Sequence, residues 1–115
     1  MATNVYDPSI VSDEHIKLGE HGDFKLVELT RSRKRKFRDA MKELEKLESD
    51  ETDEGELESV RYIGLAIEAT TEGSDGIADK LRDDYEADRI TDGFLARALK
   101  QTIGWAEDQQ RLGEA

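Results

Sequence analysis

A change of hydrophobic period at Thr30 constrains the fold more than any other feature of this sequence. Before it, residues 24–29 (FKLVEL) form a short apolar run with strand-like composition. After it, apolar residues recur at helical spacings of three and four: Phe37, Ala40, Met41, Leu44 and Leu47. Thr30 suits an N-cap, so its hydroxyl is expected to accept a hydrogen bond from the backbone near Ser32 or Arg33. The sequence therefore predicts a strand that leads into an amphipathic helix.

The other elements follow from the same kinds of signal. Residues 15–18 and 24–29 predict a β-hairpin, because two glycines in the connection supply positive φ angles. Such a hairpin is marginal alone, so it must rest on the helices or extend a sheet in another copy. Apolar periodicity predicts helices over residues 31–48, 56–70, 76–87 and 91–111. The predicted fold class is α+β, mostly helical, with a short N-terminal β-hairpin followed by about four α-helices.

Two local expectations accompany these helices. Ser74 or Asp75 is expected to cap the third helix, and the acidic residues 49–55 are expected to form a solvated loop. The fourth helix has the widest apolar face, so we expect it to be the most buried.

The 115 residues are expected to form one domain, residues 15–112, between a leader (1–14) and a short tail (113–115). The leader is either an arm that lies on a neighbour or a disordered tail. Only 36% of the residues are hydrophobic and 39% are charged, which indicates a thin core. A docking partner or self-association would supply burial that such a core lacks.

Charge and composition exclude several classes of protein. The net charge of -11 argues against general nucleic-acid affinity, which depends on cations that displace counterions from phosphates. The chain has no cysteine for disulfides or thiolate metal sites. It shows neither a signal-peptide pattern nor an apolar run of the roughly 20 residues that a membrane span needs. We expect an intracellular, soluble protein of the cytoplasm with no membrane partner.

The densest charge cluster is RSRKRKFR, residues 31–38, with six basic residues in eight. Helical spacing places four of them in one basic stripe: Arg31, Lys34, Arg35 and Arg38. The stripe is either a solvated face that neutralises nearby acids, such as Asp39 one turn after Arg35, or a surface that binds phosphates, an acidic peptide or an import receptor. Cations near a helix N-terminus oppose the macrodipole, which keeps the binding interpretation open.

Catalytic and metal-binding constellations are not evident in the sequence. His15 and His21 flank the predicted turn beside acidic residues, but nothing fixes the geometry that zinc requires. Calcium loops built around Gly55 or Gly73 lack the glutamate needed at position twelve. Nucleophile-elbow and phosphate-loop motifs are also missing. We expect a protein that is not an enzyme and needs no cofactor or metal.

The order of elements resembles a known family. A hairpin leading into LVELTRSRKRKFRDAM, then an acidic loop and helices carrying IGLAIEATTEG and ITDGFLARALKQTIGW, is similar to the small tail assembly chaperones of long-tailed bacteriophages, particularly those of actinobacteria. The resemblance covers overall size, acidity and layout from about Ile16 to Trp105. It implies a non-catalytic protein that coats the tape measure protein during tail morphogenesis, with self-association and a helical client. It assigns no functional residue.

We expect a client helix to lie in an apolar groove near Ile63, Ile67, Leu95 and Leu99, if the core does not need them all. Trp105 and Tyr62 are expected to be core residues, with a partner anchor as the alternative. Two other functions fit the sequence. One is a small virion structural protein, such as a head-tail joining or tail component, and the other is an acidic nucleic-acid mimic that inhibits a DNA-handling enzyme.

Overall fold

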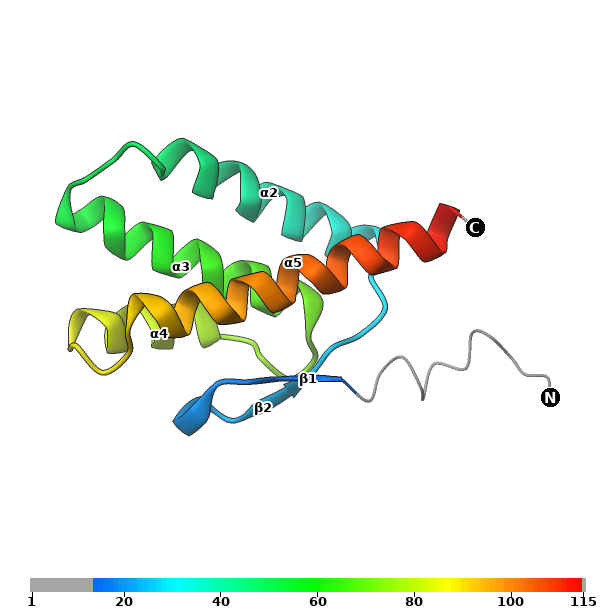
Figure 1. Ribbon diagram of the computed structural model, residues 1–115, viewed down its shortest axis with the longest axis horizontal. Coiled ribbons are helices and arrows are strands. Elements are labelled where there is room, and N and C mark those ends of the chain that lie inside the picture. Colours follow the sequence, from blue (N-terminus) through cyan, green and yellow to red (C-terminus); the bar gives the residue numbers. More distant parts are fainter. Residues whose placement is uncertain (1–13, 115) are drawn as a thin grey trace.

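The structure, a computed structural model, describes residues 14–114. It has the α+β fold that the sequence predicts, a short N-terminal hairpin followed by four helices (Figure 1). The elements are β1 (His15–Lys17), the 3-10 helix η1 (Gly19–His21), β2 (Asp23–Lys25), α2 (Arg31–Leu47), α3 (Asp53–Thr70), α4 (Ile77–Glu86) and α5 (Asp92–Glu114). The prediction for the leader falls on residues outside the described part, apart from Glu14. None of the helices within residues 14–114 has the length and apolar character needed to cross a membrane.

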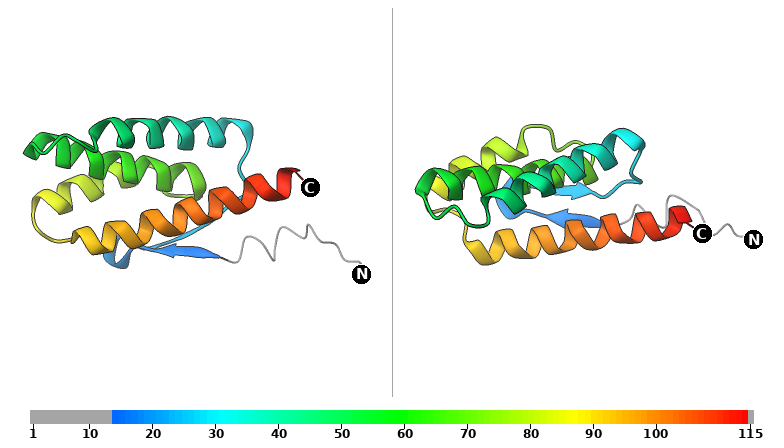
Figure 2. Two further views of the ribbon diagram at one scale, coloured as in Figure 1. Left: turned by 45° about the horizontal axis from the view of Figure 1, so that its top comes forward. Right: turned by 90° about the horizontal axis from the view of Figure 1, so that it is seen from above.

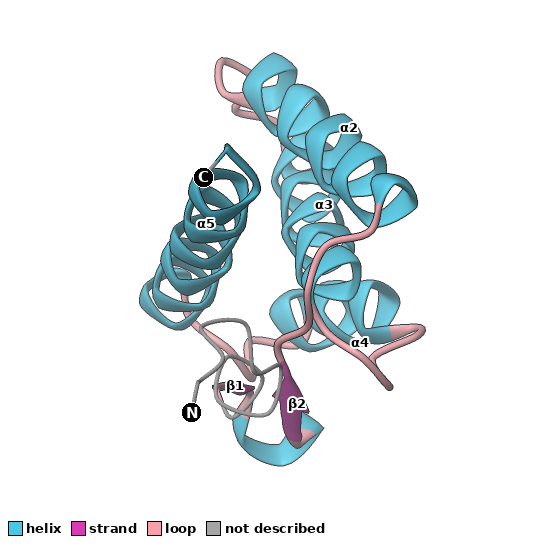
Figure 3. Ribbon diagram, turned by 90° about the vertical axis from the view of Figure 1, so that its right-hand side faces the viewer, coloured by secondary structure: helices cyan, strands magenta, loops and turns pink. Residues whose placement is uncertain are grey.

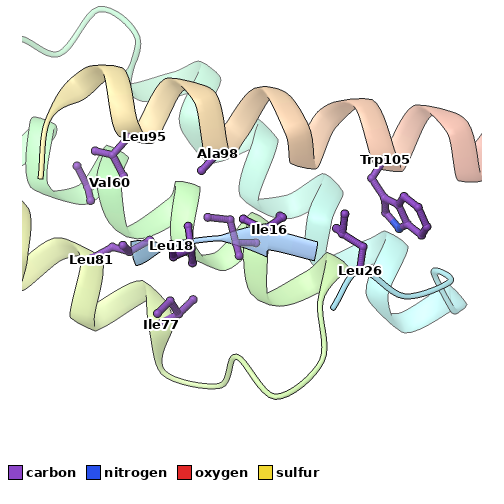
Figure 4. Close-up of a cluster of buried hydrophobic side chains, with 10 residues drawn as sticks. Ile16, Leu18, Leu26, Val60, Ile77, Leu81, Leu95, Ala98 and Trp105 are labelled. Atoms are coloured by element: carbon purple, nitrogen blue, oxygen red, sulfur yellow. The ribbon is translucent and has the colours of Figure 1, made fainter. Parts of the chain in front are cut away.

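Helix α3 is the centre of the molecule and contacts α2, α4 and α5. Helices α2 and α3 form an antiparallel pair, and α5 runs alongside α3 and over β1 (Figures 1 and 2). The core lies between α3, α4, α5 and the hairpin (Figure 4). Its buried members are Ile16, Leu18, Leu26, Val60, Ile67, Ile77, Leu81, Leu95, Ala98 and Trp105.

The hairpin is anchored to the helices of its own chain. Its strands are antiparallel with Ile16 opposite Phe24, and Gly19 and Gly22 in the turn have positive φ angles of 59° and 102°, as predicted. The strands are shorter than predicted, because residues 27–29 leave the ladder after the Leu26 amide, which donates to the Glu14 carbonyl at 2.8 Å. The Val27 amide instead donates to the Thr70 carbonyl at 3.0 Å, beside a single bridge between Leu26 and Thr71. The connection between α3 and α4 therefore supplies the third partner that a lone hairpin lacks.

Two helix starts show how local side chains set the boundaries. The prediction for α2 is confirmed, since the Thr30 hydroxyl accepts a hydrogen bond from the Arg33 amide at 3.2 Å. Helix α3 begins three residues earlier than predicted, because the Thr52 hydroxyl caps it by accepting from the Gly55 amide at 3.0 Å. The acidic residues 53, 54 and 56 lie in its first turn, where they interact favourably with the helix dipole. The expectation of a solvated loop through residue 55 was therefore wrong.

The cap of α4 also differs from the prediction. Its N-cap is Gly76, at φ 88°, and makes no side-chain capping hydrogen bond. The Ser74 hydroxyl is hydrogen-bonded to the Thr71 hydroxyl at 2.6 Å instead. A carboxylate from α3 caps the start of α4 instead. Glu68 Oε2 accepts a hydrogen bond from the Ala78 amide at 3.0 Å. This cap has no local sign in the sequence, since its donor and acceptor are ten residues apart.

Burial is distributed differently from the prediction. Helix α3, not α5, contributes the largest share of the buried positions among the described residues, many of them small: Gly55, Val60, Gly64, Ala66, Ile67, Ala69 and Thr70. Small side chains let the other three helices approach α3 closely. Helix α5 continues through Glu114, so part of the predicted tail is helical. Trp105 is in the core, as predicted, and its indole Nε1 donates to the Val27 carbonyl at 2.8 Å.

The junction between α4 and α5 gives a prediction about pH. The Tyr85 hydroxyl donates to Asp92 Oδ1 at 2.8 Å, and this hydrogen bond, with partial burial and the charges of Asp92 and Glu56, raises the pKa of Tyr85 to about 12. The neutral phenol is thus favoured in the folded chain. Its contribution to stability should be complete below about pH 10, the pKa of an unfolded tyrosine, and should be lost as the pH rises through about 12.

Urea unfolding of the parent and of Tyr85→Phe at pH 8 and at pH 11 to 12 tests this expectation. The advantage of the parent over the variant should shrink at the higher pH. A constant difference between the two proteins would contradict it.

Candidate functional site

The four stripe residues gather on one exposed surface of α2, as their spacing predicts. Arg31, Lys34, Arg35 and Arg38 together line a shallow hollow of about 280 Å³. Within residues 14–114, none of the four forms an ion pair, and the expected contact between Arg35 and Asp39 is not made. We call this surface the basic hollow. Arg31 and Lys34 lie in the first turn of α2, where the helix dipole disfavours a cation by about 0.3 to 1 kcal/mol.

The other two cations of the run have structural partners. Arg33 Nη1 donates to the carbonyls of Glu68, Ala69 and Thr71 at 3.3, 3.2 and 2.7 Å, where α3 ends without other cations in its last turn. Lys36 Nζ lies 3.6 Å from Glu68 Oε1. The sequence contained a sign of this role, because Arg33 is four residues before Phe37 and therefore on the apolar face of α2. Arg33 thus caps the C-terminal end of α3. Among the described residues, the four cations of the basic stripe form no ion pair.

An apolar groove lies between α2 and the C-terminal half of α5, two helices that stand apart in the end-on view of Figure 3. The groove has a volume of about 460 Å³. Its apolar lining is half-buried and comprises Leu29, Phe37, Met41, Ile103 and Ala106. Lys34 and Arg38 line it from the α2 side, and Glu107 and Gln110 from the α5 side. We call it the α2–α5 groove.

The groove exists because α2 buries only part of its apolar face. Ala40 is 3% exposed against the rest of the fold, whereas Phe37, Met41, Leu44 and Leu47 remain half-buried. A helix with such a regular apolar stripe would normally bury most of it. The uncovered part of this apolar face is therefore accessible to a partner.

The predicted groove near Ile63, Ile67, Leu95 and Leu99 needs correction. Ile67 is 0% exposed and Leu95 is 3% exposed, since both belong to the core and are closed to a partner in this structure. Ile63 and Leu99 are half-buried, and Ile63 packs against the core cluster. The sequence could not separate these roles, because core residues and groove residues follow the same helical period.

A second hollow, of about 590 Å³, lies where η1 meets the start of α5, and three of its titratable side chains contact one another. His21 Nε2 is 2.7 Å from Asp84 Oδ2, and Arg89 Nη1 is 3.5 Å from Asp84 Oδ1. Within the described chain, no hydroxyl is hydrogen-bonded to His21, and no three His, Asp or Glu side chains are placed to hold a metal ion. His15 lies apart on β1, where its carbonyl accepts from Gln101 Nε2. In this hollow, side chains of η1 and α4 contact each other, and the described residues form no catalytic arrangement there.

Tyr62 is not a core residue, contrary to the expectation. It is half-buried on the outer side of the α2–α3 pair, with the Arg61 guanidinium 5.5 Å from the centre of its ring. The neighbouring surface carries mostly charged residues of α2, among them Lys36, Asp39 and Lys42. The ring is thus covered by a cation of its own chain.

Comparison of this chain with models of protein families, with curated proteins and with solved structures finds no match. The α2–α5 groove and the basic hollow beside it are therefore the surfaces of this protein that bear on its function.

Proposed function

We propose that this protein is a non-catalytic binding protein that holds an amphipathic helix of a partner in the α2–α5 groove. The observation that carries the proposal is the half-buried apolar lining contributed by α2, by α5 and by the segment just before α2, where the two helices do not close on each other: Leu29, Phe37, Met41, Ile103 and Ala106. An amphipathic helix placed in an apolar groove is a recurring mode of peptide recognition. A second helix between α2 and α5 would cover the apolar surface that the fold leaves open.

The resemblance in size, acidity and element order supports a role as a tail assembly chaperone of a long-tailed bacteriophage. The client would then be the tape measure protein, a long and largely helical chain, bound in the host cytoplasm during tail morphogenesis. A groove that takes one short helical segment suits such a client, because many copies could bind along its length. The alternative of a nucleic-acid mimic is less well supported, since the four exposed cations of the basic hollow interrupt the acidic surface.

Titration of helical segments from any tape measure protein encoded in the same genome, monitored by calorimetry, tests the proposal. The parent should bind at least one segment, and Met41→Glu and Ile103→Glu should each abolish binding, because both place a charge in the groove. Leu65→Glu is the matched control, since Leu65 is equally half-buried but lies on the outer surface beside Tyr62. Circular dichroism checks that all variants keep their helices.

Equal affinities for the parent and both groove variants would refute the proposed site. Mass spectrometry of purified virions separates the chaperone from its closest rival, since a chaperone should be absent from finished particles. Recovery of the protein in stoichiometric amounts from virions would instead favour a structural component of the head-tail junction or tail.

A further inference from the structure

The α2–α5 groove and the basic hollow share two residues. Lys34 and Arg38 line both surfaces, so the apolar groove continues directly into the hollow along one side of α2. Arg31 and Arg35 complete the hollow, and all four cations are exposed. A helix lying in the groove would therefore have one of its edges beside a row of unpaired positive charges.

Helical geometry sets the spacing of that row. From Arg31 to Arg38, α2 rises by about 10 Å in two turns, at 1.5 Å per residue. Carboxylates spaced three or four residues apart on a partner helix recur at the same interval. The other wall of the groove differs, because Glu107 and Gln110 stand there. The two edges of a bound helix would thus meet different charges.

From these observations we infer that the α2–α5 groove selects helices that carry a row of Asp or Glu along one edge of their apolar face. This inference rests on the proposed function and specifies which helices the groove accepts. The basic hollow would supply the specificity, and the apolar lining most of the affinity. An acidic edge would also offset the unfavourable placement of Arg31 and Lys34 in the first turn of α2.

A protein partner fits these charges better than a nucleic acid does. A long polyanion would be repelled by the net charge of -11, because its phosphates extend well beyond the hollow. A short acidic edge meets only the local cations, and charges beyond the Debye length of about 8 Å are screened at physiological salt.

Two designed helical peptides with the same apolar stripe test the inference, one with Glu along one edge and one with Gln at those positions. The acidic peptide should bind the full-length chain about tenfold more tightly at low salt, since several exposed ion pairs each add a small gain. The difference should shrink as the salt concentration rises. The double variant Lys34→Glu, Arg38→Glu should remove or reverse the preference.

The matched control is Lys42→Glu, Lys100→Glu, which changes the net charge equally at exposed positions outside the groove lining and should keep the preference. Equal binding of both peptides by the parent would overturn the inference and leave the proposed function standing. If neither peptide bound, the proposed function would fail with it.

Two further results would show that another occupant takes the surface, and each would overturn the inference. One is a dimer of the free chain in sedimentation that Met41→Glu converts to a monomer, which would place a second copy in the groove. The other is a DNA duplex that binds the parent but not the Lys34→Glu, Arg38→Glu variant.

Discussion

Gly64→Ala is expected to destabilise the protein by about 3 kcal/mol, near the upper end of the usual cost of overpacking a core. Helices α3 and α4 cross here so closely that a Cβ on Gly64 would collide with the backbone of Ala78, and it would lie 2.9 Å from the Ala78 Cβ. The Ala78 backbone, in the first turn of α4, cannot move aside as the end of a long side chain can. Denaturant unfolding followed by circular dichroism measures the loss.

Gly104→Ala is the matched control for this prediction. Gly104 is also a helical glycine, in α5, but a Cβ added there meets no atom within 4 Å. Alanine has the higher helix propensity, so this variant should gain about 0.5 to 1 kcal/mol. If both variants shifted stability in the same direction, the close crossing of α3 and α4 would not be the reason for glycine at position 64.

Arg33→Met is expected to cost about 2 to 3 kcal/mol. The guanidinium supplies hydrogen bonds to three carbonyls at the end of α3, and methionine keeps the apolar part of the side chain but leaves these carbonyls without that donor. Arg33→Lys should lose less stability than Arg33→Met, because the ammonium group retains the positive charge near the C-terminal end of α3. Thermal and urea unfolding of the three proteins would rank them.

Arg35→Met is the control for position 33, because Arg35 is exposed and makes no ion pair within residues 14–114. Its stability should stay within about 0.5 kcal/mol of the parent. A similar loss at positions 33 and 35 would mean that net charge, and not the cap on α3, accounts for the effect.

The features that the sequence could predict are those set by neighbouring residues. The change of period at Thr30 located both the end of the hairpin region and the start of α2, and the spacing of Arg31, Lys34, Arg35 and Arg38 placed them on one surface. A capping residue acts on an amide two or three positions away, and a helical face repeats within one or two turns. Both are therefore visible in a short stretch of sequence.

The features that escaped prediction depend on residues far apart in the chain. Glu68 caps α4 and Arg33 caps α3 only because the helices pack in this arrangement. The same is true of the apolar residues, since Ile67 and Leu95 are buried while Phe37 and Ile103 line the groove. Periodicity shows which face of a helix is apolar, but the packing of its neighbours decides how much of that face is covered.

The hydrogen bond from Gln101 to the His15 carbonyl connects α5 to β1, and that from Trp105 to the Val27 carbonyl connects α5 to the segment after β2. During synthesis on the ribosome, the final contacts of the hairpin can therefore form only after nearly the whole chain has been made. The α2–α3 pair, whose contacts are closer in sequence, is complete much earlier. We expect nascent chains that stop before α5 to contain a helical pair with an unattached N-terminal segment.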